Sequence, residues 1–146
     1  PDPQMDELTV PFLGEERAAL QYPFESLRRA GARLAMGSDW AVTTADPLAQ
    51  LEVAITRAGR GTGSFLPDQR LPVDVALDAF TAGSAYVNHD DDAGAIEVGR
   101  RADLAMLDHD VLVADYATPD SAPLGDASVV LTVAAGRVVH ERGLPS

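Results

Sequence analysis

The sequence contains no cysteine, no lysine and no long apolar run. Without cysteine there is no disulfide framework, no thiolate nucleophile and no thiolate metal site, so any metal must be bound by histidine or carboxylate side chains. No apolar stretch approaches the roughly 20 residues that a membrane-spanning helix needs. These absences exclude a disulfide-stabilised scaffold and argue against a membrane protein.

Positive charge is also scarce, with 11 basic against 23 acidic residues in a chain of 146 and a net charge of −12. Because so negative a field repels phosphate, we expect neither nucleic acid nor a membrane as a partner. The hydrophobic fraction of 46% is that of an ordinary globular protein, and the length suffices for one compact domain. This composition favours a cytoplasmic protein.

The first part of the sequence combines helical patterns with one short apolar run. Apolar side chains recur at steps of three and four over residues 15–30, and Gly31 is placed to end that helix. Because Pro23 removes a helical hydrogen bond, the stretch is predicted as one helix or as two short helices on either side of it. The apolar run at residues 32–39 stops in small and polar residues, which predicts a buried strand that enters a loop.

Further helices are predicted after this loop. Asp46 and Pro47 form a typical helix start, and the apolar pattern continues to about Arg57. Another helix begins at Pro72, and residues 81–87 either continue it or form a separate turn. Helix, strand, loop and helix form an α/β unit whose strand requires parallel neighbours on both sides. The sequence offers no such neighbours and does not begin with Met, so we expect a piece of a longer protein.

Short strands replace helices after the acidic cluster at residues 90–92, and we expect a domain boundary near Asp92. The strands are predicted over residues 102–107, 129–134 and 137–140, with a tight turn at Ala135 and Gly136. Residues 111–126, which contain two prolines, are predicted as a long irregular connection.

Asp39 is the strongest candidate for chemistry. A carboxylate at the C-terminal end of a buried parallel strand lies where α/β proteins bind ligands and place catalytic groups. An Asp that only caps the next turn would have the same spacing, which leaves both interpretations open. His89, His109 and His140 are far apart and form no metal-binding pair, and no serine occupies a nucleophile motif.

Two separated stretches of the chain are informative together. The first comprises residues 22–31 and 34–40, and the second comprises residues 94–108 and 130–139. In this order they resemble the closing part of the metal-dependent amidohydrolase superfamily, particularly the branch of N-substituted formamide deformylases and related imidazolonepropionase-like hydrolases. The resemblance implies an α/β fold in which residues 1–91 are the last βα units of a TIM-barrel metallo-hydrolase. Residues 92–146 would be the C-terminal strands of its accessory β-sandwich.

The same resemblance implies roles for three residues. Asp39 would be the last metal-site carboxylate, which binds the metal and takes the proton from the attacking water, while Ser38 and Trp40 would flank the substrate. Members of this superfamily use a divalent metal, here expected to be zinc, to hydrolyse amide or formamide bonds of small molecules. Their histidine ligands would precede residue 1, so the isolated fragment is expected to hold no metal and to be inactive.

Two alternatives remain open at this level. The chain is either the C-terminal fragment of an enzyme or a stand-alone binding or structural domain derived from one. In both cases the absent strands would leave strand edges and inner helix faces uncovered. We therefore expect a homo-oligomer rather than a monomer.

Overall fold

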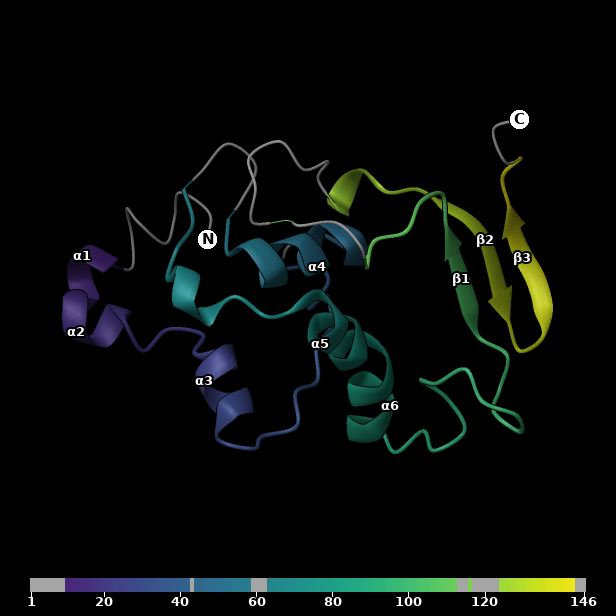
Figure 1. Ribbon diagram of the computed structural model, residues 1–146, viewed down its shortest axis with the longest axis horizontal. Helices are drawn as coiled ribbons and strands as arrows, with labels where there is room; N and C mark the ends of the chain where they lie inside the picture. Colours follow the sequence, from purple (N-terminus) through teal and green to yellow (C-terminus); the bar gives the residue numbers. More distant parts are fainter. Residues whose placement is uncertain (1–9, 43, 59–62, 113–115, 117–123, 144–146) are drawn as a thin grey trace.

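The computed structural model describes residues 10–42, 44–58, 63–112, 116 and 124–143. The fold is α/β, with short helices gathered at one end and a three-stranded antiparallel sheet at the other (Figure 1). Of the helices in these ranges, none has the length and apolarity that crossing a membrane requires.

Three short helices begin the described chain: α1 (Val10–Leu13), α2 (Glu15–Ala18) and α3 (Phe24–Arg29). Pro23 is the N-cap of α3, so the prediction of two helices separated by this proline is confirmed. Gly31 ends α3 with a φ of 90°, and the amide of Ala32 donates to the carbonyl of Leu27 at 3.0 Å. This is the bonding pattern of a glycine-terminated helix.

A buried carboxylate ties the last turn of α3 together. Glu25 is 4% exposed and accepts two hydrogen bonds from Arg28, at 2.7 and 2.8 Å, and one from Arg29 at 2.7 Å. The hydrogen bonds from Arg28 are the largest cause that lowers the pKa of Glu25 from 4.5 to about 2, and burial opposes them. The ion pair therefore stabilises the fold fully above pH 4.5, and this stabilisation is lost as the pH falls towards 2.

Replacing Glu25 with Gln is expected to make the free energy of unfolding less dependent on pH below 4.5. The wild-type free energy of unfolding, measured by urea denaturation at successive pH values, should fall between pH 4.5 and pH 2 more steeply than that of the variant. Glu16→Gln, on the exposed surface of α2, is the matched control and should follow the wild type. Parallel curves for Glu25→Gln and the wild type would contradict this account of Glu25.

Residues 32–38 follow α3 without regular secondary structure, so the prediction of a buried strand over residues 32–39 is wrong. Leu34, Met36 and Ser38 are half-buried, and the residues between them are exposed, an alternation typical of extended chain. A strand needs a hydrogen-bonded neighbour, and the described residues form only one sheet, at the other end of the chain. The segment instead contacts helices: the amide of Met36 donates to the carbonyl of Ala79 at 2.9 Å.

Helix α4 (Pro47–Thr56) confirms the predicted start at Asp46 and Pro47. The Asp46 carboxylate accepts from the backbone amides of Leu48 and Ala49, which satisfies donors that a helix N-terminus otherwise leaves free. The 3₁₀ turn η2 (Pro67–Gln69) leads to α5 (Val73–Asp78).

A π-helical turn, η3 (Ala79–Gly83), joins α5 to α6 (Ser84–Val87), so residues 81–87 continue the preceding helix. Gly83 lies directly against residues 34–35. A Cβ atom at Gly83 would overlap the carbonyl oxygen of Leu34 and lie 3.3 Å from the Cα of Ala35. The helix and the extended segment therefore approach each other at a distance that only glycine permits.

The sheet has the order β1 (Leu104–Leu107), β2 (Val129–Ala134) and β3 (Arg137–Glu141), which confirms the three predicted strands. Both neighbouring pairs are antiparallel. Ala135 and Gly136, with φ values of 48° and 77°, form the predicted tight turn between β2 and β3.

The core combines both parts of the chain. It is formed by helix α4, the start of α5 and the connection between β1 and β2, which contains the 3₁₀ turn η4 (Leu124–Asp126). Its buried members are Leu51, Ile55, Leu71, Ala76, Val111, Leu124 and Ala127. The predicted irregular connection, where it is described, thus contributes core side chains, and the domain boundary near Asp92 stays a prediction.

Arg101 links the end of α6 to the sheet. Its guanidinium donates two hydrogen bonds to Asp90, at 2.7 and 3.1 Å, and one to Asp103 at 2.5 Å. Asp103 also accepts from the amide of Ala135 at 2.7 Å, and this bond is the main cause that lowers the pKa of Asp103. Because these groups are partly exposed, the network orients the hairpin rather than contributing much stability.

Candidate functional site

Asp39 lies where the extended segment turns towards α4. The amide of Val42 donates to the carbonyl of Asp39 at 2.8 Å, which closes a tight turn, and Asp39 has a φ of 49°. Aspartate tolerates this left-handed conformation better than most side chains. The Asp39 side chain is exposed.

Asp39 follows the half-buried part of the segment but is itself exposed. Leu34 and Met36 pack against the core, and Ser38 continues this half-buried series. The chain leaves the extended conformation at Asp39, and the residue is accessible in the structure. Among the residues that the structure describes, a substrate or metal therefore has open access to this carboxylate.

Ser38 and Trp40 lie on either side of Asp39 but differ in their surroundings. The hydroxyl oxygen of Ser38 accepts a hydrogen bond from the backbone amide of Trp40 at 3.3 Å, so it takes part in the turn. Trp40 is 69% exposed, and Val42 beside it is 75% exposed. Two large apolar side chains thus follow Asp39 closely in the chain and are exposed as it is.

Sequence patterns did not single out Gln50, although it holds this loop. From the first half of α4, its side-chain amide donates to the carbonyl of Ser38 at 3.0 Å and to the carbonyl of Thr44 at 2.8 Å. A lone Gln inside an amphipathic helix carries no recognisable signal, because its partners are backbone atoms of a loop whose path the sequence does not show.

The histidines do not join Asp39. His109 contacts the carboxylate of Asp108 at 2.8 Å, and His140 lies 3.3 Å from the carbonyl of Val129. Across the described ranges, no group of three or more His, Asp or Glu side chains is arranged to hold a metal ion.

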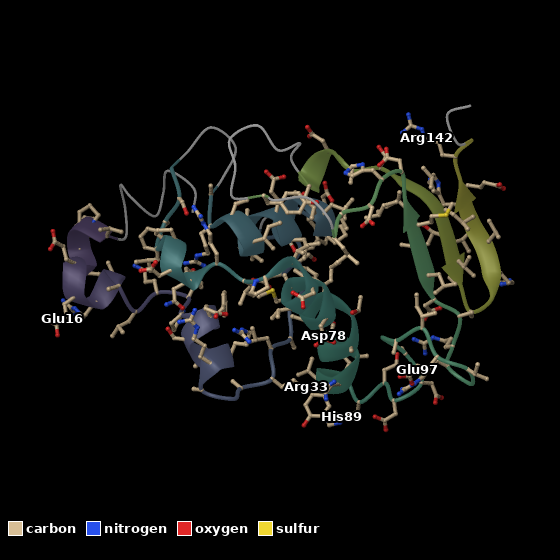
Figure 2. All side chains as sticks on the ribbon, viewed as in Figure 1. Glu16, Arg33, Asp78, His89, Glu97 and Arg142 are labelled. Atoms are coloured by element: carbon tan, nitrogen blue, oxygen red, sulfur yellow. The ribbon has the colours of Figure 1, made fainter. Side chains whose placement is uncertain are left out.

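A separate pocket of about 280 Å³ opens between α3, the start of the extended segment and α5. Arg33 and Asp78, which both line it, are labelled in Figure 2. Arg33 also places its guanidinium 4.0 Å from the ring centre of Tyr86. Asp39 does not line this pocket. Among the charged residues that do, Arg28 already forms an ion pair with Glu25.

The Amidohydrolase family model matches residues 1–140, and the chain belongs to this family.

Curated relatives agree with this assignment. The N-substituted formamide deformylase of Arthrobacter pascens is 30% identical over 131 residues, which cover 88% of this chain and 23% of that protein. Protein LONG AFTER FAR-RED 3 of Arabidopsis thaliana is 35% identical over 100 residues, which cover 65% of this chain and 17% of that protein. The chain therefore spans less than a quarter of the length of these relatives. No solved structure matches it.

Proposed function

We propose that this chain is the C-terminal part of a metal-dependent hydrolase that cleaves non-peptide C–N bonds of amide or formamide type in small molecules. The observation that carries the proposal is the position of Asp39, exposed at the end of the extended segment. Family membership and the similarity to a formamide deformylase support the reaction class. In this proposal residues 1–91 complete a TIM barrel, residues 92–146 complete its β-sandwich, and the whole protein is cytoplasmic.

The described residues can supply one ligand of a metal site. Asp39 offers an exposed carboxylate, and a catalytic zinc needs three or four ligands, so the rest would come from the longer protein. A divalent metal, zinc in our proposal, would when bound make water a better nucleophile at neutral pH, and Asp39 would be one of the residues that hold it. Asp39 orients the attacking water and accepts its proton.

Ser38 and Trp40, on either side of Asp39, are the proposed substrate-binding residues. Trp40 presents an exposed indole beside the carboxylate and walls the pocket, while Ser38 sets the turn from which that indole projects. Substrate atoms near the C–N bond would thus lie between an apolar wall and a proton acceptor.

The proposal is tested on the complete gene product. Purified protein is assayed with N-substituted formamides and simple amides, before and after chelation, and its zinc content is measured. We expect hydrolysis that chelation abolishes and zinc restores, whereas the 146-residue chain alone should show neither turnover nor stoichiometric zinc. Tight zinc in the isolated chain would contradict the proposal, and a gene that begins beside Pro1 would favour the stand-alone domain.

We further propose that the isolated chain self-associates through its sheet. Leu104, Val133 and Val138 are neighbours on one face, and Leu104 and Val138 are 39% and 59% exposed. Light scattering at increasing concentration should show a dimer or larger species, and Val138→Lys should shift it towards monomer. A wild-type chain that stays monomeric at high concentration would refute this.

A further inference from the structure

We infer that Gln50 is a positioning residue for Asp39, acting through the backbone of the loop that carries it. The inference rests on the proposed function and deepens it. Its basis is the pair of hydrogen bonds that one side-chain amide donates, to the carbonyl of Ser38 and to the carbonyl of Thr44. These two carbonyls lie immediately before and shortly after the turn at residues 39–42.

The bond to Ser38 constrains Asp39 because the peptide unit between them is planar. The Ser38 carbonyl, the Asp39 amide and the Asp39 Cα share one plane, so holding the carbonyl fixes the N–Cα bond of Asp39, and the φ of 49° then sets the direction of its side chain. The left-handed conformation of Asp39 is sparsely populated in free chains and needs such support from its surroundings.

The bond to Thr44 closes the loop at its other end. The hydroxyl of Thr44 accepts from the amide of Asp46 at 3.1 Å, and Asp46 caps α4. Gln50, on the same helix, therefore joins both ends of the loop to one rigid element. Because the bond to Ser38 is partly buried, water competes less for it than it would at the surface.

Gln50→Glu is the test substitution because it keeps the shape of the side chain and removes the donor. The new carboxylate oxygen would face two carbonyl oxygens and repel them. Gln50→Lys restores a donor, on a side chain one bond longer. Gln69→Glu is the matched control, since Gln69 also donates to a residue distant in sequence, Ser26 Oγ at 2.8 Å, but this bond joins η2 to α3.

The first measurement is amide hydrogen exchange in metal-free complete protein. The amides of Trp40 and Val42 donate within the turn, so Gln50→Glu should raise their exchange about tenfold, whereas Gln69→Glu should not. The second is steady-state hydrolysis, in which Gln50→Glu should lower kcat about 10- to 100-fold with little change in KM or zinc content. Gln50→Lys should recover much of kcat.

The outcomes separate the two proposals. Unchanged exchange, or unchanged kcat, in Gln50→Glu of an active enzyme overturns the inference about Gln50 alone. A Gln50→Lys variant as impaired as Gln50→Glu would also overturn it, because a donor would then not be what matters. A wild-type protein that hydrolyses none of the amides overturns the proposed function itself and, with it, the role of Gln50.

Discussion

Asp39→Asn is expected to lower kcat/KM of the complete hydrolase by about a thousandfold, the range in which positioned proton acceptors contribute. Asn keeps the size of the side chain and the turn at residue 39, but it cannot accept a proton at neutral pH and is a poorer metal ligand. Steady-state kinetics with an N-substituted formamide checks the rate, and elemental analysis checks the zinc.

Asp46→Asn provides the matched control for this change. Asp46 lies on the same loop, and Asn caps a helix as well as Asp does, so activity should stay near that of the wild type. If Asp39→Asn retained most of its activity at full zinc occupancy, Asp39 would be only the turn-capping residue that the sequence left open.

Gly83→Ala is expected to cost about 2–3 kcal/mol in the free energy of unfolding, as overpacking between two fixed backbones does. The new methyl group would overlap the Leu34 carbonyl. Neither side can retreat easily, because the Met36 amide is bonded to the Ala79 carbonyl at 2.9 Å. The sign of the change in the free energy of unfolding distinguishes overpacking from helix propensity, because propensity alone would favour Ala over Gly by about 1 kcal/mol. Urea denaturation measures the loss.

Gly143→Ala serves as the control for Gly83→Ala. A Cβ at Gly143 meets no atom within 4 Å, so this variant should unfold within about 0.5 kcal/mol of the wild type. Equal stability of both variants would show that the helix and the segment at residues 34–35 separate more easily than the structure indicates.

Local chemistry explains which elements were predictable. The ends of α3 and α4 could be predicted from the sequence, because they depend on Pro23, Gly31 and Asp46. Each of these residues acts on backbone groups only a few positions away. The turn at Ala135 and Gly136 is local in the same way, and the alternating patterns around it predicted β2 and β3.

Nonlocal contacts explain what was missed. The run at residues 32–39 has the composition of a buried strand, but strand formation depends on neighbours that the described residues do not supply. Val111 and Leu124 belong to the core, although the stretch that contains them has no hydrophobic periodicity. They were missed because they pack with α4, which is far away in the sequence. Gln50 was missed because its role depends on where two loop carbonyls lie.

The sequence by itself determined the start of α3, both ends of α4 and the three strands, since these depend on residue types at short spacings, and its resemblance to a family pointed to Asp39, whose role stays a prediction. Only the tertiary structure decided that Asp39 is exposed, that Gly83 permits the close approach of helix and segment, and that Gln50 holds the loop. These are contacts between residues distant in the chain, and the folded backbone alone brings such residues together.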